Sequence, residues 1–176
     1  MKKILSILLL FTSLYSEATL YFGTNYGVVN EKFTNNKGTK SASQSLNINF
    51  GYGDINAYAI NLGVDIIKSK ESTISNKDGK QYNFNIDLIK AFNFDIFMNP
   101  FFQAGFGMGN IKVASSTQNS LGYGSLNLGA GIFIPINHYF NVEIGYKYKY
   151  LSYERFEEKS YKSHQNTIYS GISFRY

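Results

Sequence analysis

Residues 139–150 read YFNVEIGYKYKY, and every second residue of this stretch is apolar or aromatic, at positions Phe140, Val142, Ile144, Tyr146 and Tyr148. The residues between them are polar, charged or glycine. Successive side chains of a β-strand point to opposite faces of a sheet. A period of two therefore predicts a strand with one apolar face and one polar face.

The same alternation recurs along the rest of the chain. It occupies seven further segments, which are residues 19–29, 44–53, 57–67, 81–92, 100–112, 121–134 and 165–176. Between the apolar positions these segments carry mainly asparagine and glycine, with a few charges of both signs. We therefore expect eight strands of 10 to 14 residues each.

The chemistry of the polar face decides the class of β protein. A soluble sandwich turns this face to water and would crowd it with charged residues. Asparagine and glycine prevail instead, and glycine weakens a strand unless another group approaches closely. The inside of a narrow barrel requires such close approach, while the apolar face can turn to lipid. Because only helices and closed barrels satisfy their backbone inside a bilayer, we expect an all-β fold: an eight-stranded antiparallel up-and-down transmembrane β-barrel.

The predicted connections alternate in length. In chain order they contain 14, 3, 13, 7, 8, 4 and 14 residues, so the odd-numbered connections are the long ones. Bacterial outer-membrane barrels have short periplasmic turns and longer outside loops. The four long connections are therefore expected outside the cell, with both chain ends on the periplasmic side.

The first eighteen residues have the layout of a secretory signal peptide. Lys2 and Lys3 form a basic start, residues 4–14 are an apolar run, and small residues at 16 and 18 precede a cleavage point after Ala18. We expect residues 1–18 to be removed and residues 19–176 to form the barrel domain of an exported protein. The full chain has 176 residues, a net charge of +5 and no cysteine, which excludes a disulfide framework and a cysteine-based metal site.

Two further stretches carry a family resemblance. Residues 103–107 read QAGFG and the closing residues 172–176 read ISFRY. With the signal peptide and the eight strands, these stretches resemble the small eight-stranded outer-membrane barrels, such as the transmembrane domain of outer-membrane protein A and the OmpX- and opacity-type proteins. The resemblance implies an outer-membrane location. It also implies that the barrel-assembly machinery reads a closing signal formed by Ile172, Phe174 and Tyr176.

Charged residues on the inner face are candidates for a functional site. By parity they are Asp65, Asp87, Glu143, Lys147, Lys149 and Arg175. Side chains fill the interior of an eight-stranded barrel, so paired charges are expected to form a structural polar plug. A small-ion or solute channel is the first alternative. A secreted soluble barrel, with its apolar faces turned inward around an apolar ligand, is the second.

The net charge of the mature chain, +4, lies in the long connections 30–43 and 68–80. Six lysines in these segments are candidate contacts for lipopolysaccharide, whose phosphates attract cations: Lys32, Lys37, Lys40, Lys68, Lys70 and Lys77. The alternative is that these are ordinary solvated loops. Besides lipid and lipopolysaccharide, any host or surface ligand of the loops stays unidentified.

The remaining aromatic and titratable residues predict no chemistry. The tyrosines Tyr146, Tyr148, Tyr150 and Tyr153 are expected to belong to an aromatic girdle at the membrane interface, rather than to stack on sugars or nucleic acid. Lys90 and Lys112 depart from the apolar parity near strand ends, where they can snorkel to the headgroups. Neither His138 nor His164 has a nucleophile two places away, so no enzyme and no cofactor are expected. A monomer without nucleic-acid partners is expected.

Overall fold

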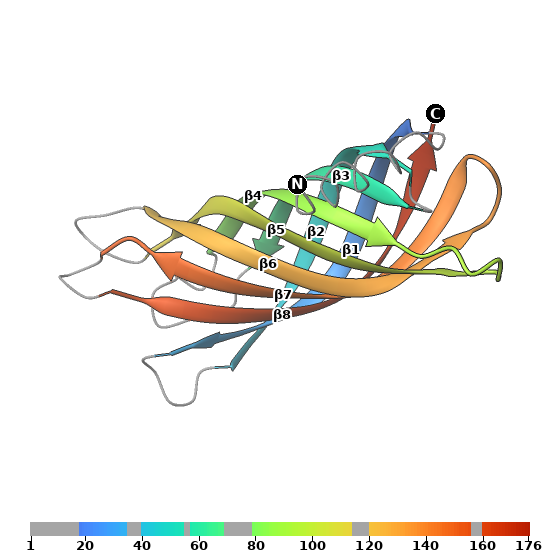
Figure 1. Ribbon diagram of the computed structural model, residues 1–176. Helices are drawn as coiled ribbons and strands as arrows, with labels where there is room; N and C mark the ends of the chain where they lie inside the picture. Colours follow the sequence, from blue (N-terminus) through green and yellow to red (C-terminus); the bar gives the residue numbers. More distant parts are fainter. Residues whose placement is uncertain (1–17, 35–39, 55–56, 69–78, 114–119, 156–159) are drawn as a thin grey trace, which may run out of the picture.

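The alternating segments form eight long antiparallel strands in the computed structural model, which describes residues 18–34, 40–54, 57–68, 79–113, 120–155 and 160–176. The strands are β1 (Thr19–Phe33), β2 (Lys40–Gly53), β3 (Tyr58–Lys68), β4 (Lys80–Ala91), β5 (Asn99–Lys112), β6 (Ser120–Pro135), β7 (Phe140–Tyr153) and β8 (Lys162–Arg175). Each strand pairs with the next in sequence, and β8 pairs with β1, which closes the barrel (Figure 1). The predicted fold class is confirmed.

The apolar face of each strand lies on the outside of the barrel. On β5, for example, Phe102 is 62% exposed, whereas the neighbouring Phe101 points inward and is 1% exposed. Large apolar side chains are exposed on the outer faces of all eight strands, and buried asparagines and charges lie on the inner faces. This distribution is the reverse of that in a soluble domain.

The two ends of the barrel carry different connections. Residues 34–39, 69–79, 113–119 and 154–161 join strands at one end, which we call the loop end. Residues 54–57, 92–98 and 136–139 join them at the other, the terminus end, where β1 starts and β8 finishes (Figure 1).

Strands β1 and β2 extend further than the sequence predicts. The segment 30–43 was expected to be a loop, but β1 continues to Phe33 and β2 begins at Lys40. The outward residues Asn30 and Lys32 are polar, so the apolar period ends while the backbone ladder continues. The longest connection in the structure is consequently 69–79.

Glycines on the inner face of the barrel avoid clashes with the atoms that fill its interior. A Cβ atom added to Gly105 would lie 2.1 Å from the carbonyl oxygen of Ile86 and 2.3 Å from Oδ1 of Asp87. By contrast, a Cβ added to Gly124 on the outer face of β6 would meet nothing within 4 Å. Comparing substitutions at these two glycines therefore separates the effect of a steric clash from the effect of strand propensity.

Gly105→Ala is expected to destabilise the barrel by about 1–3 kcal/mol, because the backbone must shift to relieve overpacking. Gly124→Ala is expected to change stability by less than about 0.5 kcal/mol, or to stabilise slightly through the unfolded chain. Urea unfolding of the refolded protein in detergent, followed by circular dichroism, measures both. Equal effects at the two positions would contradict the packed interior.

Candidate functional site

Two ion pairs cross the interior of the barrel. Nζ of Lys147 lies 2.9 Å from Oδ2 of Asp87, and Lys149 is paired with Asp65. The lysines project from β7, whereas Asp65 and Asp87 project from β3 and β4 on the other side of the closed sheet. These contacts therefore link strands that share no backbone hydrogen bonds.

Asparagines satisfy the remaining oxygens of the two aspartates. Asn47 and Asn85 each donate a side-chain N–H to Asp65 over 2.7 Å. Asn127 donates to Oδ1 of Asp87 over 3.1 Å. A buried charge is tolerated only when it is paired and hydrogen-bonded. The inner asparagines predicted by parity thus provide the donors that these carboxylates need.

Glu143 and Arg175 lie apart from the two ion pairs. The hydroxyl of Tyr169 donates to Oε1 of Glu143 over 2.6 Å, and Gln103 donates to the same hydroxyl over 3.1 Å. Arg175 lies at the terminus end, where it lines an open pocket of about 480 Å³ with His138 and other residues. Of the six inner charges expected from the sequence, the structure therefore brings four together.

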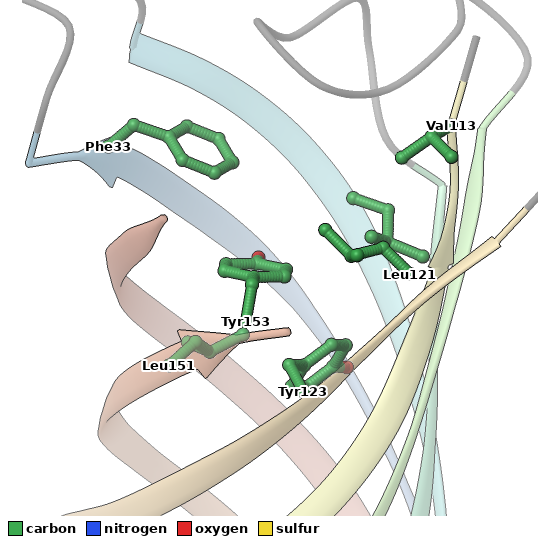
Figure 2. Close-up of a cluster of buried hydrophobic side chains, with 7 residues drawn as sticks. Phe33, Val113, Leu121, Tyr123, Leu151 and Tyr153 are labelled. Atoms are coloured by element: carbon green, nitrogen blue, oxygen red, sulfur yellow. The ribbon is translucent and has the colours of Figure 1, made fainter. Parts of the chain in front are cut away.

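Apolar clusters close the interior at both ends. The loop-end cluster consists of Phe33, Ile111, Val113, Leu121, Tyr123, Leu151 and Tyr153. Figure 2 shows Phe33, Tyr123 and Tyr153 pointing toward one another, and the ring of Tyr153 lies 5.8 Å from that of Phe33 and 5.2 Å from that of Tyr123. The terminus-end cluster consists of Tyr21, Ala59, Ile89, Ala91, Phe101 and Phe133. The polar network lies between two apolar layers.

The two apolar clusters were not expected from the sequence, and the expected position of one tyrosine is wrong. Tyr153 was expected in the outer girdle, which is wrong, since it is buried in the loop-end cluster. Its odd number puts it on the same face of β7 as Lys149, and this parity was the signal that could have placed it inside. Inward-facing Phe101, which lies within the predicted strand 100–112, gave the same signal.

A seventh inner charge, Glu31, was also missed. Its Oε1 accepts hydrogen bonds from the hydroxyls of Tyr153 at 2.8 Å and Ser163 at 2.6 Å. The carboxylate is buried beneath the loop-end cluster. Its segment was assigned to a loop, so no parity was read for it.

The cavity that lies beside the ion pairs is small. A cavity of about 30 Å³ lies beside Asp65, Lys147 and Lys149. Such a volume has room for about one or two water molecules. The ion pairs therefore tie opposite walls of the barrel together, and the cavity beside them is too small for a hydrated ion.

Lysines occupy the outer face of the strands near the loop end. Within the described part of the chain, exposed examples are Lys32, Lys68, Lys80, Lys112 and Lys162. Lys68 is the direct register partner of Lys80, and Lys32 is that of Lys40. Like charges directly opposite one another destabilise a strand pair. The side chain of Lys40 is not described, and Lys37, Lys70 and Lys77 lie outside the described residues.

The other predicted surface residues lie on the outer wall. Ile172 and Phe174 point outward from β8, and Tyr176 is exposed at its end. The hydroxyl of Tyr148 lies 2.5 Å from Nδ1 of His164, so both side chains lie on the outer face. The neighbouring Ser163 points inward, away from His164.

No group of three His, Cys, Asp or Glu residues in the described segments could hold a metal ion. Among these residues there is also no helix of the length and apolarity needed to cross a membrane.

Comparisons with known proteins identify the fold. No protein-family model matches the sequence, and no curated protein matches it. The solved structure of Neisserial surface protein A is similar with a TM-score of 0.74 and 16% identity, over 92% of this chain and 100% of that one. Ail, the attachment invasion locus protein of Yersinia pestis, gives 0.60 and 18% over 92% and 100%. OprG, an outer membrane protein from Pseudomonas aeruginosa, gives 0.54 and 13% over 90% and 95%.

At these identities the likeness is one of fold. The chain has the closed eight-stranded architecture of the small outer-membrane barrels, and the resemblance drawn from its sequence is confirmed at that level.

Proposed function

We propose that this protein is an integral outer-membrane barrel with a closed interior, which serves in envelope structure and in surface interaction through its loop end. The observation that carries this proposal is the reversed polarity of the wall. Apolar side chains are exposed around the outside, whereas ion pairs and asparagines are buried within. Such a surface is stable in lipid and would aggregate in water.

Three further parts of this proposal rest on the sequence and its family resemblance. Residues 1–18 direct export as a cleaved signal peptide, although residues 1–17 lie outside the described part of the chain. Ile172, Phe174 and Tyr176 form the signal read by the barrel-assembly machinery. The protein is a monomer and carries no catalytic residue or cofactor.

The packed interior argues against a channel. A solute would have to pass the loop-end cluster, the cross-lumen ion pairs and the terminus-end cluster in turn. The buried charges equally argue against an apolar ligand inside a soluble barrel, because they would lie in its binding cavity.

In planar bilayers we expect the purified protein to give no regular conductance steps. Reproducible steps that scale with protein concentration would overturn the closed interior.

The paired lysines near the loop end support binding of outer-leaflet lipopolysaccharide. Lys68 and Lys80 repel one another across β3 and β4 unless an anion lies between them. Phosphates at the membrane surface would supply that anion. The paired lysines lie on the outer face of the wall, where a lipid headgroup can reach them.

Lys68→Gln combined with Lys80→Gln is therefore expected to lower the amount of lipopolysaccharide that co-purifies with the barrel. Salt should weaken lipopolysaccharide binding to the unmodified protein, since exposed charges are screened, and should weaken the binding that remains in the double variant less. Lys90→Gln, which removes one lysine near the terminus end, is the matched control and should bind as the unmodified protein does. Unchanged co-purification in the double variant would mean that these lysines are simply solvated.

A further inference from the structure

The connection 92–98 at the terminus end has an unusual composition for a turn. It reads FNFDIFM, and its side chains Phe94, Ile96 and Phe97 are 62%, 53% and 70% exposed. Turns in water are dominated by glycine, proline, asparagine, aspartate and serine. A contiguous exposed apolar group of this kind marks an interaction site.

The backbone holds this turn in a defined shape. Oδ1 of Asn93 accepts a hydrogen bond from the N–H of Asp95 over 2.8 Å, and Asp95 adopts a φ of 57°. At the base of the turn, the N–H of Phe92 donates to the carbonyl oxygen of Pro100 over 2.9 Å. The apolar side chains are therefore presented outward by an ordered turn.

A row of rings connects this turn to the outer wall. Phe92 lies edge-on to Phe102, with centroids 6.1 Å apart, and stacks on Phe94 with centroids 6.2 Å apart. Phe102 belongs to the exposed apolar face of β5. The apolar surface that faces lipid thus continues around the end of the barrel into the turn, at the same end as the C-terminus (Figure 1).

Lys90 marks the level at which this apolar surface meets polar groups. Its Nζ lies 3.8 Å from the ring centroid of Tyr58 and 5.5 Å from that of Phe92. Aromatic rings concentrate at the headgroup level of membranes, and a lysine near a strand end extends toward the phosphates. Together, these rings and the ammonium match the interface of a phospholipid leaflet.

We propose that residues 92–98 form an aromatic anchor that inserts into the headgroup and upper acyl region of the periplasmic leaflet. Its ligand is phospholipid, with Phe94, Ile96 and Phe97 packed against the headgroups and the first acyl carbons and with Lys90 at a phosphate. This inference rests on the proposed function, because it requires the outer wall to face lipid. It adds a segment beyond the strands to the membrane-embedded surface, and it makes the two ends of the barrel chemically different.

The chain contains no tryptophan, so a single tryptophan reports on one position alone. Phe97→Trp would be reconstituted in vesicles of phosphatidylethanolamine and phosphatidylglycerol, with bromine on the upper acyl carbons in a parallel sample. Phe106→Trp on the outer wall of β5 is the lipid-exposed control. Thr34→Trp at the loop end is the water-exposed control. Each variant is first checked for folding by its cold migration on SDS gels.

The expected result is blue-shifted emission from Phe97→Trp, with fluorescence lost to brominated lipid and protected from iodide, as for Phe106→Trp. If Phe106→Trp is quenched by brominated lipid while Phe97→Trp is quenched only by iodide, the anchor is excluded and the outer-membrane proposal stands. A turn that is free in water or reserved for a periplasmic protein would give this second pattern. If neither variant is quenched by lipid, the proposed function itself fails.

Discussion

Lys149→Met is expected to destabilise the folded barrel by about 3–5 kcal/mol, the cost of leaving one member of a buried ion pair without its partner. In the folded protein Lys149 is paired with Asp65 and also donates to Oδ1 of Asn85 over 3.2 Å. Methionine keeps the unbranched shape and most of the length of the side chain, and it removes the charge. The carboxylate of Asp65 then stays buried without its ion-pair partner. Urea unfolding in detergent micelles, followed by circular dichroism and by the gel shift, measures the loss.

Two controls separate charge pairing from simple loss of a lysine. Lys162→Met removes an exposed lysine from the outer face of β8 and is expected to change stability by less than about 0.5 kcal/mol. Adding Asp65→Asn to Lys149→Met should restore a large part of the stability, because the uncompensated charge is gone. If the double variant were as unstable as the sum of the single ones, the ion pair would not be the source of the effect.

Leu128→Arg is expected to destabilise the membrane-embedded barrel by about 2–4 kcal/mol, the cost of an arginine on the lipid face near the bilayer midplane. Leu128 is 59% exposed on the outer wall, where its register partners are Ala104 on β5 and Tyr148 on β7. It lies between further exposed apolar residues along β6. Unfolding of the protein reconstituted in phospholipid vesicles gives the value.

The matched substitution is Asn110→Arg on the outer face of β5 near the loop end. There the expected cost is only about 0–1 kcal/mol, because the side chain reaches the interface. A soluble barrel would accept Leu128→Arg without loss, since an exposed leucine would simply be exchanged for a charged residue. Equal stability of the Leu128→Arg and unmodified proteins would therefore exclude the lipid-facing wall.

The strands could be predicted because parity determines which side chains share a face, and the asparagine and glycine on the polar face indicated that this face turns inward. Each outward position of β7 from Phe140 to Tyr150 is apolar or aromatic, and the inward lysines follow from the same count. Once the barrel is closed, Asp65 and Lys149 can meet only in its interior. The polar and charged character of the interior could therefore be predicted from the sequence.

The ends of the barrel could not be predicted in the same way. The outer face becomes polar beyond the apolar belt, so the alternation that reveals a strand disappears at Asn30 while the strand continues. This loss of signal hid Glu31 and Phe33. Which aspartate pairs with which lysine depends on the stagger of strands far apart in sequence, and the strand pattern alone does not give it. The apolar surface of residues 92–98 was hidden because a turn has no period to read.

The most direct test of the account is to fractionate expressing cells and to run the detergent-extracted envelope on SDS gels, with and without boiling. A closed barrel with an apolar wall should be found in the outer-membrane fraction, and its unboiled form should migrate faster than its boiled form. A protein recovered in the soluble periplasmic fraction, with the same migration before and after boiling, would contradict the outward apolar face on which every other inference depends.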